Sequence, residues 1–244
     1  MTPEEVDRFL GLPRGSFDHI PNYARQAALV AIANVRELEE RQLFRPGLYY
    51  IVLIDLTSST EASKSLGLEL NQKRVQTFIT ASVEALGHIE LSSYAQFLKE
   101  IGDATLFIFS SFEDLYHWWG AVENAFFTYN NEWAGELGDK LFRAFNISAK
   151  TVVHLGEVSY ITKGNPLSLA VNQVFKIEKL FGAGQLGCTE AVRSAACPHF
   201  QKFKIQPLRA KDVTLPGDDS VSSTWIIGTN KLNLLAGKSV VRPA

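Results

Sequence analysis

The chain has 244 residues, 46% of them hydrophobic and 20% charged, so it is long enough and apolar enough to bury a full core. Its net charge of −2 and its pI near 6.2 give no basic field for neutralising phosphates, which argues against binding to a nucleic-acid polymer. No apolar run approaches the roughly 20 residues of a membrane span, and the acidic N-terminal segment does not resemble a secretory signal, so a cytoplasmic protein is expected.

The N-terminal region predicts a helix over residues 21–42, where good helix formers recur at helical spacing. Pro46 and Gly47 end this pattern just before a strongly β-prone run. We therefore expect residues 1–46 to form a helical extension and residues 47–244 to form a single domain.

The β-prone run over residues 48–56 is almost continuously apolar, which indicates a central strand covered on both faces. Residues 57–61 (TSSTE) then supply side chains that favour a helix N-terminus, and a long helix is predicted over residues 68–86. Residues 94–109 predict two strands that meet at Gly102 and Asp103, a turn dipeptide.

The second half of the chain predicts alternating helices and strands, with no internal repeat. We expect an aromatic-rich helix at 112–130, a loop at 131–140, a strand pair at 143–161 turning around 154–157, a helix at 168–181, and strands near 200–205 and 222–227. The resulting β-α-β-β-α-β order predicts an α+β, ferredoxin-like or palm-like domain, with helices over a largely antiparallel sheet.

Two aspartates are the strongest functional candidates. Asp55 lies at the end of the first apolar strand, and Asp103 lies at the tip of the predicted hairpin. The two carboxylates would converge if the hairpin paired with that strand, and they could then bind hard divalent cations. A structural role is the alternative, in which Asp55 caps the following helix and Asp103 only favours its turn. Cys188 and Cys197 have no metal-ligand spacing and are expected to be reduced thiols.

Four motifs in order resemble the catalytic domain of the class III adenylate and guanylate cyclases. They are VLIDLTSST, FLKEIGDATLFIF, ISAKTVVHLGEV and LAVNQVFKIEKLFGAGQLGCTEAVRS, and the similar region runs from about residue 48 to residue 227. The resemblance implies a class III cyclase fold and the conversion of a ribonucleoside triphosphate to a cyclic nucleotide and pyrophosphate. It also implies a homodimer whose active sites lie at a head-to-tail interface.

The resemblance assigns a role to each matching position. Asp55, Asp103 and a backbone carbonyl near Leu56 would bind two divalent cations, Mn²⁺ or Mg²⁺. The loop that would receive the triphosphate consists of Thr57, Ser58, Ser59 and Thr60. A helix N-terminus suits this role because its free N–H groups and its dipole favour phosphate.

The residues expected around the ribose and the base depart in part from the family pattern. Asn172 matches the asparagine that orients the ribose, and Lys176 stands where the family places a transition-state arginine. Lysine keeps the charge but lacks the planar fork of arginine. Lys99 matches a base-reading lysine, whereas its usual aspartate partner is replaced by Asn165. An amide both donates and accepts hydrogen bonds, unlike an ionised carboxylate.

These departures look most like the bacterial pyrimidine cyclases of Pycsar anti-phage defence. A UTP substrate is therefore favoured over CTP, with a cyclic product read by a separate effector protein. Two alternatives stay open: an adenylate or guanylate cyclase, and a catalytically silent cyclase-like regulator that binds a nucleotide. The phosphate-gripping lysine of the late strands aligns with Thr214, so Arg209 or Lys211 could substitute for it, while His154 is expected to be structural.

Overall fold

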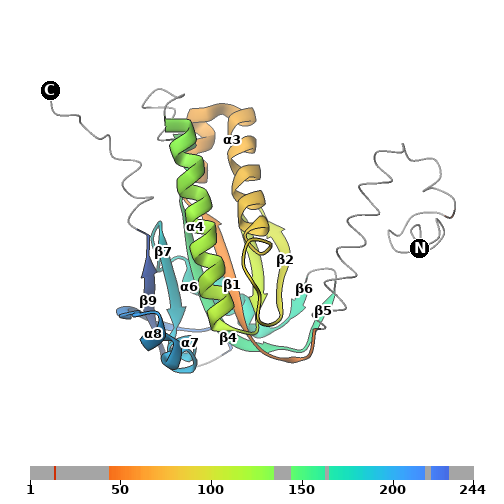
Figure 1. Cartoon of the computed structure of the whole chain (residues 1–244), viewed down its shortest axis with the longest axis vertical. Coiled ribbons are helices and arrows are strands. Elements are labelled where there is room, and N and C mark those ends of the chain that lie inside the picture. The colour runs from red at the N-terminus through yellow and green to blue at the C-terminus, as the bar shows by residue number, and fades with distance from the viewer. Residues whose placement is uncertain (1–13, 15–43, 135–143, 163–164, 218–220, 231–244) are drawn as a thin grey trace. The chain divides into compact units, whose positions relative to one another are not determined.

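The computed structural model describes residues 14, 44–134, 144–162, 165–217 and 221–230 (Figure 1). The helix expected at 21–42 lies outside these residues, so the proposed extension stays a prediction. The helices and strands in chain order are β1 (Gly47–Leu56), α3 (Ser59–Glu84), β2 (Ala95–Ile101), β3 (Ala104–Phe109), α4 (Phe112–Ala134), β4 (Ala149–Val158), β5 (Tyr160–Thr162), β6 (Asn165–Leu167), α6 (Leu169–Glu178), β7 (Gln185–Thr189), α7 (Glu190–Ala195), α8 (Cys197–Lys202), β8 (Leu208–Thr214) and β9 (Val221–Thr229).

The described residues contain one seven-stranded sheet, in the order β2-β3-β1-β4-β7-β9-β8. The pairing of β4 with β7 is parallel, and the other strand pairs are antiparallel. The elements β1, α3, β2, β3, α4 and β4 reproduce the predicted β-α-β-β-α-β order, and their four strands are arranged as in a ferredoxin-like sheet. The predicted fold class is therefore confirmed. A separate hairpin, β5–β6, follows β4.

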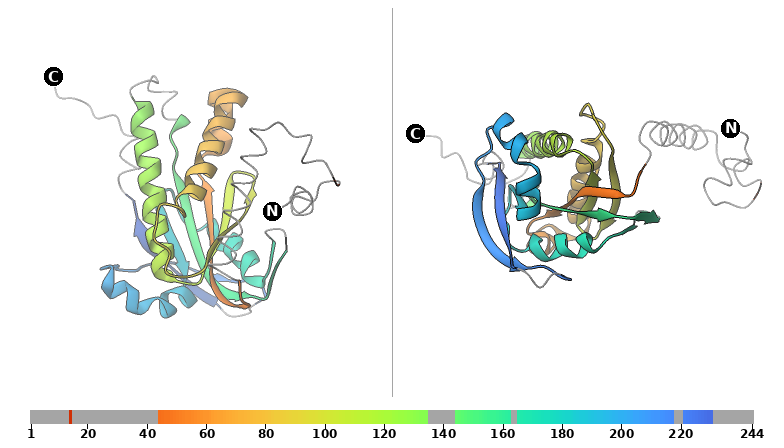
Figure 2. Two further views of the ribbon diagram at one scale, coloured as in Figure 1. Left: turned by 45° about the vertical axis from the view of Figure 1, so that its right-hand side comes forward. Right: turned by 90° about the horizontal axis from the view of Figure 1, so that it is seen from below.

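Helices lie on both faces of the sheet. In the right-hand view of Figure 2 the strands run between α4 on one side and α6 on the other. Tyr50, Val52 and Ile54 of β1 belong to the core that Trp118 of α4 also joins. Since side chains alternate along a strand, Asp55 is directed to the opposite face, where α6 packs on β1 and β4.

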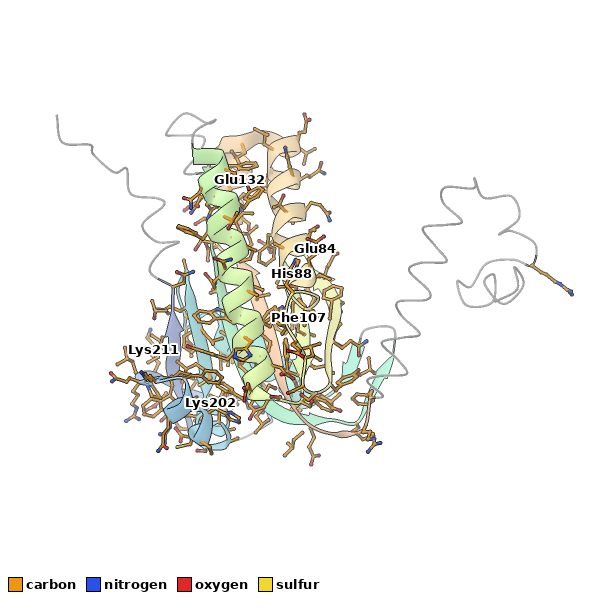
Figure 3. The ribbon with its side chains drawn as sticks, in the orientation of Figure 1. Glu84, His88, Phe107, Glu132, Lys202 and Lys211 are labelled. Carbon is orange, nitrogen blue, oxygen red and sulfur yellow. The ribbon has the colours of Figure 1, made fainter. Side chains whose placement is uncertain are left out.

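The core under α4 is aromatic. The Phe107 and Trp118 rings lie 4.6 Å apart between centroids, and both side chains are fully buried (Phe107 is labelled in Figure 3). At the base of α4, Glu113 pairs with Lys202 of α8 at 2.5 Å (Lys202 is labelled in Figure 3). The α8 segment is therefore held against the start of α4 by packing and by charge.

Two expectations about the helices need correction, and the helix expected over residues 68–86 is confirmed. Gly67, with φ of 75° and ψ of 174°, interrupts α3, so a first part begins at Ser59 and a second part begins near residue 68 and ends at Glu84. Ser58 adopts a left-handed conformation and its side chain makes no capping bond, so the expected side-chain cap is wrong at this residue. Helix α4 continues to Ala134, and only residues 131–134 of the expected loop are described.

Two predicted strand features are also wrong. The strand pair expected to turn at residues 154–157 is the single strand β4, because residues 149–158 all pair with β1 without interruption. In place of the strand expected at residues 200–205, the structure has the end of helix α8, up to Lys202, followed by a turn, and Phe200 packs against Phe112. Pro198 lies in the first turn of α8, where proline is well tolerated, and tertiary packing outweighs the β propensity of Phe200.

Close packing seats α6 on the sheet. A side chain at Gly156 of β4 would bring its Cβ to 2.3 Å from the Ala170 Cβ, so glycine is required where the helix meets the strand. The expected core stripe of α6 is confirmed, since Ala170, Val174 and Ile177 are buried, as is Phe181 just beyond the helix. Cys188 is buried and Cys197 is exposed, and both are free thiols.

Candidate active site

The sheet brings the two candidate aspartates together. Strand β1 pairs with β3 so that Asp55 lies opposite Ala104, the residue that follows Asp103. The Leu56 N–H also donates to the Asp103 carbonyl at 3.1 Å. The hairpin tip is thereby fixed beside the end of β1, which is the adjacency that a shared cation site requires.

The Asp55 carboxyl is largely buried and faces a cation, Lys150. Its side chain is only 21% exposed. Burial raises the pKa of Asp55 to about 6, and the Asp103 charge contributes in the same direction, although contact with Lys150 opposes the shift. The carboxylates of Asp55 and Asp103 therefore interact, and a further cation nearby would stabilise the ionised form.

Lys150 is a central residue of this site that the sequence motifs did not identify. Its Nζ lies 3.2 Å from Asp55 Oδ2 and also contacts Glu178 Oε1 at the end of α6. Burial lowers the pKa of Lys150, but the hydrogen bonds to the two carboxylates outweigh burial and raise it overall. A signal was present in the sequence, because Lys150 is the one cation in the apolar run of β4.

Replacing Lys150 with methionine is expected to destabilise the fold by about 2 kcal/mol, because two partly buried carboxylates would lose their shared partner. Adding Glu178→Gln should recover part of this loss, since one of the facing negative charges is then removed. Urea unfolding followed by circular dichroism measures both changes. The control is Lys179→Met, because Lys179 directly follows Glu178 in the chain but is exposed. A Lys150 variant as stable as this control would contradict the bridging role.

The loop after β1 is tightly held on its inner side. The Thr57 N–H and the Thr57 hydroxyl both donate to the Ser148 carbonyl, each at 2.8 Å. The Ser59 hydroxyl donates to the Leu56 carbonyl at 3.1 Å, which leaves one lone pair of that oxygen for a cation. Ser58 and Thr60 are exposed, and the first N–H groups of α3 have no partners within the helix. This loop retains the groups that would face a phosphate.

Asn172 and Lys176 share the outward face of α6. Ser168 caps this helix by accepting the Ala170 N–H at 3.1 Å, and both candidate residues, one turn apart, are exposed. Asn172 lines a surface cavity of about 730 Å³ together with Ser168 and Glu157.

The two base-reading candidates lie on elements that contact each other. Lys99 is in β2, directly after a bulge in its pairing with β3, and Asn165 begins β6, which contacts β2. A signal for the bulge at Leu98 was not evident in the sequence.

His154 is buried and its Nδ1 lies 2.9 Å from the Thr189 hydroxyl, which agrees with the structural role expected for it.

One chain does not bring all the candidates to one place. The buried face of α6 packs over β1 and β4, so Glu178 reaches Lys150 beneath the helix. Asn172 and Lys176 occupy the opposite, exposed face. The metal-ligand candidates and the ribose and phosphate candidates therefore lie on different sides of α6 within one chain.

The late-strand candidates lie at the surface of β8. Arg209 donates from Nη2 to both carboxylate oxygens of Asp212 at 2.9 Å and so forms an ion pair. Thr214 and Lys211 are exposed on β8.

No helix in the described part of the chain is both long enough and apolar enough to cross a membrane.

The donor set fits a divalent cation. Mg²⁺ and Mn²⁺ prefer oxygen ligands and keep several waters, so two carboxylates and the Leu56 carbonyl are a sufficient protein contribution. No group of three or more His, Cys, Asp or Glu side chains suited to a metal occurs among the described residues, so further ligands would be water or phosphate.

Comparison with known proteins identifies the fold. No protein-family profile and no curated protein matches the chain, but solved structures of class III cyclase catalytic domains do. The guanylyl cyclase Cya2 superposes with a TM-score of 0.57 at 17% identity, covering 77% of this chain and 95% of its own. The adenylyl cyclase CyaB from P. aeruginosa gives a TM-score of 0.57 at 12% identity, covering 76% and 96%. An adenylate cyclase of Trypanosoma brucei, solved in its monomeric state, gives 0.54 at 14% identity, covering 75% and 88%. The domain thus has the class III cyclase fold.

Proposed function

We propose that this chain is a nucleotidyl cyclase that converts a ribonucleoside triphosphate to the 3′,5′-cyclic nucleotide and pyrophosphate. The observation that carries the proposal is the junction of Asp55 and Asp103, which the β1–β3 pairing and the Leu56 N–H bond to the Asp103 carbonyl place side by side at the ends of paired strands. The class III cyclase fold supports the same reaction.

In the proposed reaction the ribose 3′-oxygen attacks the α-phosphorus, and the bond to the β-phosphate oxygen breaks. Two divalent cations, when bound, lower the pKa of the 3′-hydroxyl and neutralise the phosphates. Asp55, Asp103 and the Leu56 carbonyl would hold them, while the N-terminus of α3 receives the triphosphate. Asn172 orients the ribose through its amide, and the Lys176 ammonium stabilises charge that develops on the phosphate oxygens.

The active form is proposed to be a homodimer. The aspartates and the exposed face of α6 are separated within one chain, and each chain carries both sets of residues. A head-to-tail pair would place Asn172 and Lys176 of one protomer opposite the aspartates of its partner. Two equivalent sites would result.

The proposed substrate is UTP, with CTP second. The support is the amide of Asn165, which replaces a carboxylate at a base-reading position on an element that contacts the Lys99 strand. The product would serve as a second messenger for a separate effector in anti-phage defence. A purine substrate is the second candidate, because the similar structures described above are adenylyl and guanylyl cyclases.

The direct test incubates the purified chain with ATP, GTP, CTP or UTP in Mn²⁺ or Mg²⁺ and identifies the products by mass spectrometry. The expected result is cyclic UMP and pyrophosphate, formed faster than any other cyclic nucleotide. A faster reaction with ATP or GTP would establish the purine alternative. Binding of a nucleotide without any product, seen as a thermal shift, would establish a silent regulator and refute the proposed catalysis.

Replacing Asn165 with aspartate is expected to change the base preference in a defined direction. The carboxylate loses the N–H donors, so recognition of the uracil O4 acceptor is lost, whereas the cytosine amino group still finds an acceptor. The ratio of kcat/KM for UTP to that for CTP should fall by about tenfold to a hundredfold. Asn165→Gln, which keeps the amide, is the control. An unchanged ratio in the aspartate variant would contradict a base-reading role for this position.

A further inference from the structure

A second polar cavity adjoins the phosphate loop on the side of α3. It has a volume of about 290 Å³, far above the roughly 10–15 Å³ that one water molecule needs. Its lining includes residues of the loop, of α3 and of the segment before β4: Thr57, Ser58, Ser65, Arg74, Asn146 and Ser148. The cavity is therefore continuous with the loop expected to receive the triphosphate.

Three of the lining residues carry buried polar atoms that no described group satisfies. These atoms are Arg74 Nη1, Asn146 Oδ1 and Ser148 Oγ. Burying polar groups without partners is unfavourable, and most such groups in proteins are paired. The amide of Asn146 can present its nitrogen after a flip, so each of the three residues can act as a hydrogen-bond donor. This combination of groups suits an oxyanion.

Arg74 is the cation of this cavity. It is 2% exposed, and its guanidinium donates from Nε to the Asn146 carbonyl at 3.1 Å and from Nη2 to the Thr57 carbonyl at 2.8 Å. Burial lowers the pKa of Arg74 to about 10 while the Asp103 charge opposes the change, so the side chain stays charged at neutral pH. The two carbonyl contacts fix the guanidinium in place, while Nη1 is buried without a partner among the described residues.

Charge also links the cavity to the candidate metal site. The Asp103 carboxylate interacts electrostatically with both Asp55 and Arg74, so the aspartate pair and the guanidinium share one charged neighbour. Glu61 is the acidic residue among those lining the cavity, and it is exposed, so water screens its charge more than that of Arg74.

We propose that this cavity, which we name the Arg74 pocket, binds the terminal phosphate of the triphosphate substrate and of the pyrophosphate product. The inference rests on the proposed cyclase function and extends it, because it adds a buried guanidinium to the phosphate site beside the N-terminus of α3. Guanidinium groups suit phosphate, since their N–H groups match its oxygens in geometry and in charge. The Ser148 hydroxyl and the Asn146 amide complete the set of donors.

The test introduces a negative charge into the pocket without disturbing the core. Ser65 is exposed and lines the Arg74 pocket, whereas Ser63 is exposed on the same helix outside it. Isothermal titration calorimetry of the full chain with pyrophosphate and Mg²⁺ should show about tenfold weaker binding for Ser65→Glu and unchanged binding for Ser63→Glu. Ser65→Arg should strengthen binding. Equal effects of the two glutamate substitutions would overturn the pocket assignment.

Substitution of the arginine itself provides a second measurement. Arg74→Lys, which keeps the charge, should bind pyrophosphate better than Arg74→Met, and the methionine variant should lose at least about tenfold in affinity. If both arginine variants bind like the unaltered chain, the inference is wrong. Assays of turnover distinguish failure of the pocket assignment from failure of the cyclase function. If the Ser65→Glu chain forms cyclic product and binds pyrophosphate with unaltered affinity, only the pocket assignment is refuted. If the unaltered chain forms no product from any triphosphate, the cyclase function is refuted.

Discussion

Replacing Asp55 or Asp103 with asparagine is expected to lower the rate of cyclic-nucleotide formation at least about a thousandfold, which corresponds to about 4 kcal/mol of transition-state stabilisation. The amide has nearly the same shape as the carboxylate but no charge, so it holds a divalent cation weakly. Each carboxylate is needed because the two act together on the cations that polarise the 3′-hydroxyl and the phosphates. The double variant should lose little more than either single variant, since the residues act as a unit.

Both variants should remain folded, for reasons visible in the structure. In the Asp55 variant Lys150 still contacts Glu178, so the ammonium keeps a partner. In the Asp103 variant asparagine is equally suited to the turn, and the Leu56 N–H bonds to the backbone carbonyl at this position, not to the side chain. Circular dichroism checks the fold, and electron paramagnetic resonance of Mn²⁺ measures cation binding.

The matched control is Asp212→Asn, an exposed aspartate paired with Arg209 on β8, which should leave the rate within about twofold. If either the Asp55 or the Asp103 variant retains more than about a tenth of the unaltered rate, the residue is not a required metal ligand. A loss of activity accompanied by unchanged Mn²⁺ binding would also contradict the assignment.

The elements best predicted from the sequence are those with strong local signals. The apolar run of β1 and the Gly102-Asp103 turn are determined by side chains close together in the chain, and both occur as predicted. The stripe of Ala170, Val174 and Ile177 likewise fixes which face of α6 is buried. Residues 200–205 differ from the prediction because Phe200 and Phe203 are β-prone, whereas in the structure their rings contact Phe112 and Tyr116 and stabilise the helix and the turn after it.

The parts of the site that could not be predicted depend on long-range pairing. The placement of Lys150 between Asp55 and Glu178 requires the β1–β4 register and the packing of α6, and neither is encoded in a short motif. Arg74 lies among polar residues of a helix whose sequence resembles a solvated surface. Its burial arises from the loop and the segment before β4, which are distant in sequence.

A mixture of two inactive variants is expected to recover activity if the site is shared between protomers. Chains with Asp103→Asn keep Asn172 and Lys176, and chains with Asn172→Ala keep both aspartates. In a head-to-tail dimer of one chain of each kind, one site carries both lesions and the other carries none. Random pairing of equal amounts makes about half of the dimers mixed, so activity should reach about a quarter of the unaltered value.

The control for this recovery mixes Asp55→Asn chains with Asp103→Asn chains. Both lesions then lie in the same half of the site, so neither arrangement of protomers produces an intact one and the mixture should stay inactive. The two mixtures distinguish a site shared between protomers from a site completed within one chain. A site within one chain predicts no recovery of activity in either mixture. Co-expression with two affinity tags ensures that mixed dimers form, and turnover per heterodimer should reach about half the unaltered value. Since α6 separates its exposed face from Asp55 within each chain, recovery in the first mixture alone is the expected result.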